Sequence, residues 1–419
     1  MRKSNMDFVS LLQAEMRPAF GCTEPIALAY GAAKVASVLP EFPNRIHARC
    51  SANIIKNVKS VVIPNSGGRK GLITAIVLGA VVGHPERELE VLGAATDEDR
   101  KRLGTLTESE FCTVELAEGV DNLYIEIVAE SDDHTAVIRI ENDHTNVIYL
   151  ALDGEVISEH AGKSKNKSDT CSMDFDSIYE FAKTGDISEI IPQIQQQISY
   201  NSAIADEGLK NSYGANIGQI LLLDEENPSL ETKCKARAAA GSDARMSGCP
   251  LPVVICSGSG NQGLTVSVPI ITTAEELHKT DEELYRALVF ANLLTLYVKT
   301  GIGKLSAYCG VVAAGVVSVA GIAFLKGESK EIIGNTLVNG LASLSGIVCD
   351  GAKPSCAGKI AISLNGAFMG YKQARLNKNY EKGDGLVAYS VDETIRSIGV
   401  VAQGMKETDV VILNEMLKH

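Results

Sequence analysis

An uncharged run between Lys304 and Lys326 constrains this chain more than any other feature of its sequence. Residues 305–325 read LSAYCGVVAAGVVSVAGIAFL, which is long enough as a helix to cross a bilayer. The run is rich in glycine and alanine rather than leucine and isoleucine, and no comparable second run is present. Small residues of this kind suit a helix packed tightly among other helices in a soluble protein. We therefore expect a buried helix and no membrane partner.

Charge and cysteine content narrow the class of protein further. The 419 residues allow two domains, and 39 Lys and Arg against 52 Asp and Glu give a net charge of −13. Nothing basic offsets phosphate repulsion, so we expect no nucleic acid as a partner. The first twenty residues do not form a signal peptide, because polar residues interrupt their apolar positions. The ten cysteines are therefore expected as thiols in a reducing, cytoplasmic setting.

The apolar pattern changes along the chain and predicts an α+β fold. Helical spacing dominates the first forty residues, whereas NLYIEIVAE, TAVIRIEN and TNVIYLAL alternate or are rich in β-branched residues. A polar stretch at 162–169 reads as a linker, and nearly everything beyond it is helical. We predict a mainly helical domain built from 1–45 and 165–419. A small α+β layer with a mixed or antiparallel sheet, residues 46–164, is inserted into it.

The tripeptide Asp-His-Thr occurs twice in this layer, at 133–135 and 143–145. Two similar strand starts in one hairpin explain the repeat, and we favour that interpretation over a role for the histidines as ligands.

Three cysteines near the C-terminus are candidates for metal binding. Cys309 precedes the apolar helix, and Cys349 and Cys356 frame the loop CDGAKPSC between two helical runs. Such a loop lets two thiolates converge while a third arrives from elsewhere. Cys249 and Cys256 have the same separation, and no C-x-x-C pair indicates a zinc ribbon. From the residues alone, packing of these cysteines in the core is favoured over metal binding.

Two glycine-rich loops are candidates for anion binding. SGSGNQG at 257–263 exposes successive backbone N–H groups, but it matches neither a P-loop nor a dinucleotide fingerprint. NSGGRKG at 65–71 adds the positive charge of Arg69 and Lys70 at a helix start. For each loop, the sequence supports an ordinary turn about as well as it supports a binding site for a carboxylate.

The segment GCTEP at 21–25 places Cys22 and Glu24 at the start of a helix opened by Pro25. A helix N-terminus that points at Cys22 would lower its pKa and give a thiolate base or nucleophile, and the residues alone support a reactive and an inert thiol equally. Glu24 either shares the acid–base work or complements the helix dipole, and the residues alone favour the dipole. A binding role and a structural ion-pair network remain open for Arg237, Asp243 and Arg245 in KARAAAGSDARMSG, with the structural role favoured.

Taken together, GCTEP, GGRKG (67–71), SGSGNQG, YCG (308–310), CDGAKPSC and GDGLVA (383–388) resemble the L-cysteine desulfidase family. That family is related to the iron–sulfur L-serine dehydratases, and the matches run in order along nearly the whole chain. The resemblance implies a [4Fe–4S] cluster with one iron open to substrate, held by Cys309, Cys349 and Cys356. Cys249 is the main rival within this set. No pyridoxal phosphate is expected.

The resemblance also implies a reaction and a set of site residues. It implies α,β-elimination from a small L-amino acid, with L-cysteine yielding pyruvate, ammonia and sulfide. Cys22 would be the acid–base group with Glu24 beside it, and the substrate would be held by Arg69, Ser257, Ser259, Gly260, Asn261, Gln262 and Gly263. An L-serine dehydratase with the same mechanism and a non-enzymatic module for small amino acids are the alternatives. The oligomeric state, with a homodimer as one option, stays open.

Overall fold

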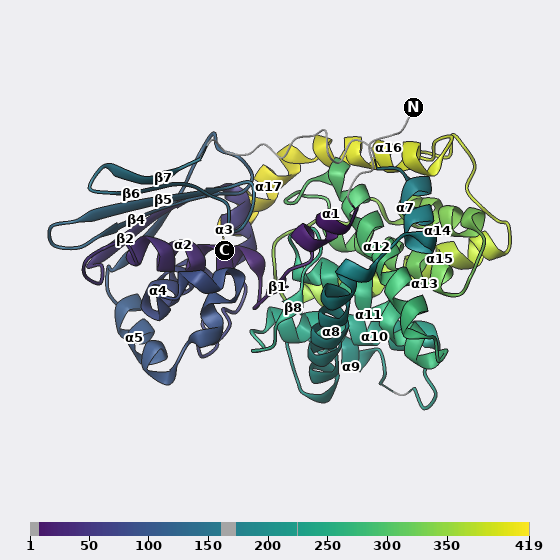
Figure 1. The fold of residues 1–419 in the computed structure, drawn as a ribbon, viewed down its shortest axis with the longest axis horizontal. Helices are drawn as coiled ribbons and strands as arrows, with labels where there is room; N and C mark the ends of the chain where they lie inside the picture. The colour runs from purple at the N-terminus through teal and green to yellow at the C-terminus, as the bar shows by residue number, and fades with distance from the viewer. Residues whose placement is uncertain (1–7, 161–172, 224, 419) are drawn as a thin grey trace.

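The computed structural model describes residues 8–160, 173–223 and 225–418, so the linker expected at 162–169 lies outside the described residues. The chain forms two lobes, a sheet lobe and a helical lobe (Figure 1). The sheet lobe comprises residues 23–160, and the helical lobe comprises 8–19 and 173–404. A mixed sheet beside a larger set of helices confirms the α+β class predicted from the sequence.

The sheet lobe is built on a six-stranded sheet of order β3-β2-β4-β5-β6-β7. β2 pairs in parallel with β3, and the remaining neighbours are antiparallel. Apolar residues on alternate positions of β5 are buried, as the period of a half-buried strand requires. The strands are β2 (Arg45–Cys50), β3 (Cys112–Leu116), β4 (Tyr124–Glu130), β5 (Thr135–Glu141), β6 (Val147–Leu152) and β7 (Glu155–Glu159).

Helix α2 (Thr23–Ala36) packs on one face of this sheet, against β4 and β5 (Figure 1). Gly31 of α2 lies against the side chains of Ile127 and Ile140 of the sheet. On the other side of α2, Gly79 of α4 (Gly71–Val82) lies against the backbone of Ala29. Residues 23–36 therefore pack with the sheet, although we expected all of 1–45 in the helical domain. Periodicity identifies a helix but does not say which neighbour buries it. The other helices of this lobe are α3 (Ala52–Val58), α4 (Gly71–Val82), η1 (Pro85–Ala94) and α5 (Asp97–Thr107).

The helical lobe surrounds one apolar helix, α13 (Gly310–Leu325), which is buried along almost its whole length. Its glycines allow close packing, since a Cβ on Gly321 would lie 2.5 Å from the side chain of Ile270. Its neighbours include α11 (Gly260–Glu276), α12 (Asp281–Ile302), α14 (Lys330–Leu344) and α15 (Ser355–Arg375). In the described ranges, no helix is both long and apolar enough to cross a membrane. The apolar run is thus a core helix that begins at Gly310.

The remaining elements complete the helical lobe around this core. They are α1 (Phe8–Glu15), α7 (Phe175–Thr184), η2 (Ser188–Ile190), α8 (Ile191–Lys210), α9 (Ile217–Ile220), α10 (Leu230–Met246) and α16 (Val391–Gly404).

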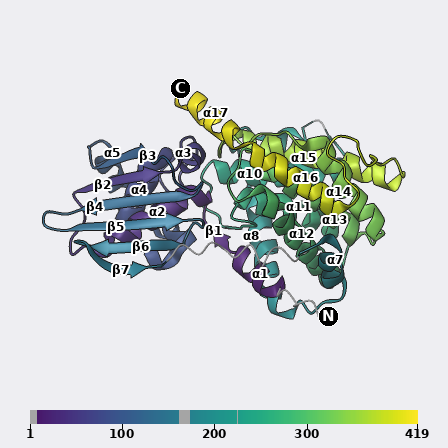
Figure 2. The ribbon, with the colours of Figure 1, turned by 90° about the horizontal axis from the view of Figure 1, so that it is seen from above.

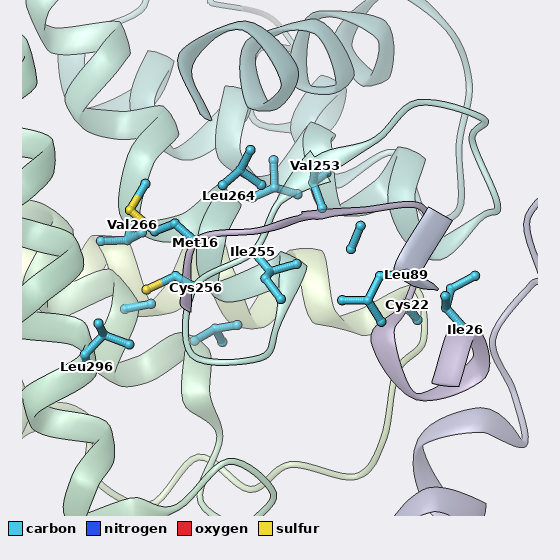
Figure 3. Packing of buried hydrophobic residues seen from close by; sticks show 14 of the residues in the cluster. Met16, Cys22, Ile26, Leu89, Val253, Ile255, Cys256, Leu264, Val266 and Leu296 are labelled. Atoms are coloured by element: carbon cyan, nitrogen blue, oxygen red, sulfur yellow. The ribbon is translucent and has the colours of Figure 1, made fainter. Parts of the chain in front are cut away.

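The N-terminal segment and α17 both help to join the lobes. β1 (Pro18–Ala19) pairs antiparallel with β8 (Val253–Val254) inside the helical lobe and contacts η1 of the sheet lobe, and the side chains around this pair form a continuous buried cluster that includes Cys22 and Ile26 (Figure 3). α17 (Lys406–Leu417) continues from α16 across to α3 (Figure 2). The start of α2 and the loops of the helical lobe are thereby held next to one another.

Candidate functional site

A short antiparallel pairing of two loops places Cys309 beside Cys349. The backbone N–H of Cys309 donates to the carbonyl oxygen of Ile347 at 3.1 Å, and that of Cys349 donates to Ala307 at 2.7 Å. A hydrogen bond between the two thiols lowers the pKa of Cys349 and raises the pKa of Cys309. The pair therefore favours negative charge on the sulfur of Cys349.

Cys356 reaches the same place from the first turn of α15. Its thiol donates to the carbonyl oxygen of Gly351 at 3.6 Å. Gly351 has φ +92°, and a Cβ there would lie 2.4 Å from the carbonyl oxygen of Lys56. Glycine thus lets the loop of residues 349–356, called the cysteine loop below, pass close to α3. The ammonium of Lys56 in turn donates to the carbonyl oxygen of Cys349 at 3.3 Å.

Cys22 lines one pocket together with these three thiols, and the pocket has a volume of about 90 Å³. Gly21, with φ +86°, sets the turn before it, and a Cβ there would overlap the ring of Pro64. The thiol of Cys22 contacts the sulfur of Met246 at 3.8 Å. Burial raises the pKa of Cys22 to about 12, and Arg245 opposes this rise. Of the two alternatives left open for Cys22, its burial favours the protonated, less reactive thiol, because exclusion from water outweighs the favourable helix start.

Four helices begin at this pocket. Cys22 is the N-cap of α2, Ser259 the N-cap of α11 and Cys309 the N-cap of α13. Cys356 lies in the first turn of α15. Each helix start carries partial positive charge and unpaired N–H groups, so the pocket favours anions such as thiolates and carboxylates.

Two buried cations add to this positive potential. Arg245 donates to the side-chain oxygen of Asn261 at 3.1 Å and to the carbonyl oxygen of Gly21 at 2.8 Å. Lys299 is 5% exposed, and its ammonium forms no ion pair with a carboxylate in the described ranges; the charges that act on it are those of Cys349, Cys309 and Cys256. Burial lowers the pKa of Lys299 to about 8. A buried ammonium without a carboxylate partner is costly, so this position favours an anion in the pocket, either a thiolate or a bound carboxylate.

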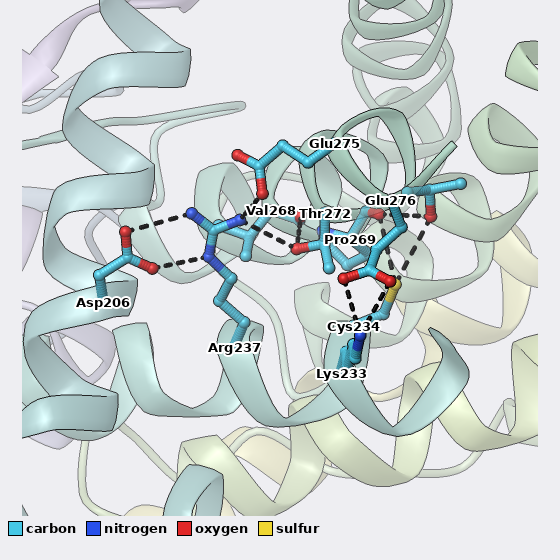
Figure 4. Close-up of polar contacts among 10 residues, drawn as sticks. Asp206, Lys233, Cys234, Arg237, Val268, Pro269, Thr272, Glu275 and Glu276 are labelled. Carbon is cyan, nitrogen blue, oxygen red and sulfur yellow. Dashed lines mark hydrogen bonds and ion pairs between the residues drawn. The ribbon is translucent and has the colours of Figure 1, made fainter. Parts of the chain in front are cut away.

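Arg237 and Asp243, which stand near Arg245 in the sequence, have structural roles. The guanidinium of Arg237 pairs with Asp206 at 2.7 Å and with Glu275 at 2.6 Å (Figure 4). Asp243 accepts a hydrogen bond from the backbone of Gly218 at 3.0 Å, and burial raises its pKa to about 6. The structural role that we favoured holds for these two, whereas Arg245 lines the pocket.

The SGSGNQG loop contributes only some of its expected residues to the pocket wall. Ser259, Asn261 and Gln262 line the pocket. Ser257, Gly260 and Gly263 are not part of its lining. Gly260 instead admits the guanidinium of Arg245, and a Cβ on Gly263 would lie 2.1 Å from the carbonyl oxygen of Val254. These glycines allow close packing that brings α11 and its cap to the pocket.

Arg69 lies away from the pocket, contrary to the expected substrate contact. Its guanidinium donates to the hydroxyl of Thr107 at 3.2 Å, beside Gly104 of α5. The basic glycine loop therefore belongs to the sheet lobe's own packing. Cys249, the rival ligand, is also outside the pocket lining and interacts with Tyr213.

Glu24 lines the pocket next to Cys22. One carboxylate oxygen accepts from Asn57 at 3.1 Å, and the other accepts from the hydroxyl of Thr23 at 3.1 Å. His144 lies 4.0 Å from the first of these oxygens. It belongs to the second Asp-His-Thr segment, which lies in the turn between the antiparallel strands β5 and β6, so the two copies occupy successive hairpins and not one hairpin as we expected. The first segment does occupy an exposed hairpin, where His134 pairs with Asp153 at 2.7 Å.

The sequence reasoning missed the lysines of the pocket. Lys299 and Lys304 are isolated charges in the apolar stretch LTLYVKTGIGKL, a pattern that would have identified them as candidates. Lys304 pairs with Asp143 at 2.6 Å, and Asp143 also pairs with Arg17 at 3.0 Å. This network fixes the second Asp-His-Thr segment against the helical lobe.

The pocket thus offers three thiols as ligands for a metal centre. Among the residues that the structure describes, no three or more His, Cys, Asp or Glu side chains converge tightly enough for a single metal ion. The nine cysteines of the described ranges are free thiols.

Comparison with known proteins gives consistent relatives along the whole chain. A UPF0597 protein of Finegoldia magna is 46% identical over 98% of this chain and 99% of its own length. A UPF0597 protein of Desulfitobacterium hafniense is 45% identical over 98% of this chain and 96% of its own. The family model of the serine dehydratase alpha chain matches residues 86–414, a range that contains Arg245, Lys299 and all three candidate ligands. The chain therefore belongs to the serine dehydratase alpha chain family.

Proposed function

We propose that this protein is an iron–sulfur lyase that catalyses α,β-elimination from a small L-amino acid, with L-cysteine converted to pyruvate, ammonia and sulfide. One observation carries the proposal: Cys309, Cys349, Cys356 and Cys22 line a single pocket at which four helices begin. Membership of a dehydratase family supports the lyase class. The small pocket volume of about 90 Å³ suits a small substrate rather than a polymer.

The donor set fits a [4Fe–4S] cluster. Cys309, Cys349 and Cys356 would supply three thiolates, and the fourth thiol of the pocket, Cys22, would stay protonated because burial raises its pKa to about 12, so that one iron would be left open. The lowered pKa of Cys349 favours the thiolate that a ligand must be. Lys56 and Lys353 add positive charge near Cys349. When bound, such a cluster supplies a Lewis acid that draws negative charge from the leaving group.

The protein's own side chains hold the substrate. Arg245 and Lys299 are buried cations of the pocket, and the charges that act on Lys299 include those of the cysteine thiols, with no carboxylate ion pair among the described residues. We assign the substrate carboxylate to these two side chains and to the N–H groups at the start of α11. Asn261 orients the guanidinium of Arg245 for this contact.

Proton transfer falls to Glu24 and Cys22. Glu24, held by Thr23 and Asn57, takes the proton from Cα. The electrons of the broken C–H bond form the Cα–Cβ double bond, and the β-substituent leaves with its bonding pair. Cys22 keeps its proton at neutral pH because burial raises its pKa, so with L-serine it can give that proton to the departing hydroxide and recover it from solvent, whereas hydrosulfide leaves without it. The aminoacrylate that is released hydrolyses to pyruvate and ammonia.

L-Serine is the second candidate substrate, because the matched family is that of the serine dehydratase alpha chain. The same contacts would hold its carboxylate, and hydroxide would leave in place of sulfide. A cytoplasmic location, a homodimer and the absence of pyridoxal phosphate stay predictions.

The test begins with anaerobic purification, followed by measurement of iron, labile sulfide and pyruvate formed from L-cysteine and L-serine. We expect Cys349→Ser to lose both iron and turnover. Cys249→Ser is the matched control, since Cys249 lies outside the pocket lining, and it should keep both. Turnover without iron would overturn the iron–sulfur mechanism. Binding of either amino acid without pyruvate would favour the non-enzymatic module.

A further inference from the structure

His144 is a buried imidazole whose hydrogen-bonding groups have no partner. Its side chain is 1% exposed, and neither ring nitrogen has a hydrogen-bond partner in the described structure. A buried ring nitrogen that lacks a partner is costly. We therefore expect the ring of His144 to form a hydrogen bond that is absent from this structure.

The group that His144 faces is the carboxylate of Glu24. The Nε2 atom of His144 lies 4.0 Å from Oε1 of Glu24, so a shift of about 1 Å brings the pair to hydrogen-bond distance. On its other side the ring lies against Gly258, where a Cβ would come within 3.3 Å of it. Glu24 and Gly258 both line the pocket, whereas His144 lies behind them.

The segment that carries His144 is held firmly from the helical lobe. Asp143 pairs with Lys304 at 2.6 Å and with Arg17 at 3.0 Å, and Arg17 also donates to the hydroxyl of Thr145 at 3.2 Å. Lys304 further pairs with Glu15 at 3.6 Å. Both neighbours of His144 are thus anchored, which directs the imidazole toward Glu24.

We propose that His144 is a positioning residue, which donates its N–H to Glu24 and fixes that carboxylate for removal of the Cα proton. This inference rests on the proposed function. In the step, Glu24 gains the proton, the C–H electron pair forms the Cα–Cβ double bond, and the Cβ–S bond breaks. Sulfide leaves with the bonding pair, and the protonated Glu24 later returns its proton to solvent.

Neutral His144 can serve in this way, because burial lowers its pKa and leaves one N–H on the ring. The sheet lobe thereby contributes a residue to the chemistry of a pocket whose thiol ligands all come from the helical lobe.

The first test compares His144→Leu, which removes the donor, with His144→Gln, which keeps one. We expect His144→Leu to lower kcat about tenfold with KM and iron content unchanged, since one hydrogen bond to a charged group is lost. The isotope effect with Cα-deuterated L-cysteine should rise, because proton removal becomes slower. His144→Gln should recover most of the rate. His134→Leu, in the exposed copy of the same tripeptide, is the matched control and should behave as the unaltered protein.

A second test needs no turnover. In ¹⁵N-labelled protein, the ring signals of His144, assigned by their loss in His144→Gln, should move when Glu24 is replaced by Gln. Unmoved ring signals overturn the inference, as do an unchanged kcat and isotope effect in an active His144→Leu protein. A protein that carries iron yet makes no pyruvate from either amino acid overturns the proposed function and this inference with it.

Discussion

Lys56 and Asp409 form a buried ion pair that ties the C-terminal helix to the cysteine loop. The Lys56 side chain is 2% exposed and that of Asp409 11%, and the Lys56 ammonium also donates to the carbonyl oxygen of Cys349. We expect Asp409→Ala to lower the free energy of unfolding by about 3–5 kcal/mol, because a buried lysine is left unpaired. Urea unfolding measures this. Replacing both partners, Lys56→Met with Asp409→Leu, should recover much of the loss, and failure to recover it would contradict the explanation.

Lys299 should destabilise the protein when the pocket holds no anion. Its pKa is about 8 in the folded chain because of burial, against an ordinary value of 10.5. The unfolded state therefore binds more protons between these values, and stability rises with pH through this window. Below pH 8 we expect Lys299→Met to stabilise the metal-free protein by about 3 kcal/mol. The difference in the free energy of unfolding between Lys299→Met and the unaltered protein should shrink as the pH rises toward the ordinary lysine pKa of 10.5. Urea unfolding of both proteins at about pH 7 and about pH 10 measures this difference.

Arg245 and Arg237 provide a matched pair of arginines on one helix. Arg245 lines the pocket, whereas Arg237 pairs with Asp206 and Glu275 outside it. We expect Arg245→Gln to raise KM for the amino acid about tenfold or more, since a charged contact to the carboxylate is lost. Arg237→Gln should leave KM unchanged. Equal effects on KM in steady-state assays would contradict the assignment of the carboxylate to Arg245.

Gly351 should be required for binding of the proposed metal centre. Alanine there would place a Cβ 2.4 Å from the carbonyl oxygen of Lys56, so the cysteine loop must move. We expect Gly351→Ala to lose most of its iron in an anaerobic iron assay. Gly383→Ala is the control, because Gly383 has a similar φ of +94° but no atom within 4 Å of the added carbon. It should cost about 1 kcal/mol of backbone strain and keep its iron.

The sequence predicted the elements better than their surroundings, and the family resemblance, not the spacing, singled out the three cysteines that line the pocket. Periodicity identified the strands and the buried apolar helix, because spacing and small residues are local properties. It did not show that α2 packs on the sheet, nor that Arg69 lies apart from the pocket, because both depend on how distant segments meet. For Cys22 the helix start was foreseen, but its burial by Met246 and Arg245 was not. Burial of that thiol arises only in the assembled fold.

The pocket walls come from segments spread from Cys22 to Cys356 along the chain. No partially synthesised chain that ends before Cys356 can carry all three sulfur ligands. The proposed cluster could therefore be assembled only on a chain synthesised beyond Cys356, and the helical lobe alone supplies its three thiols.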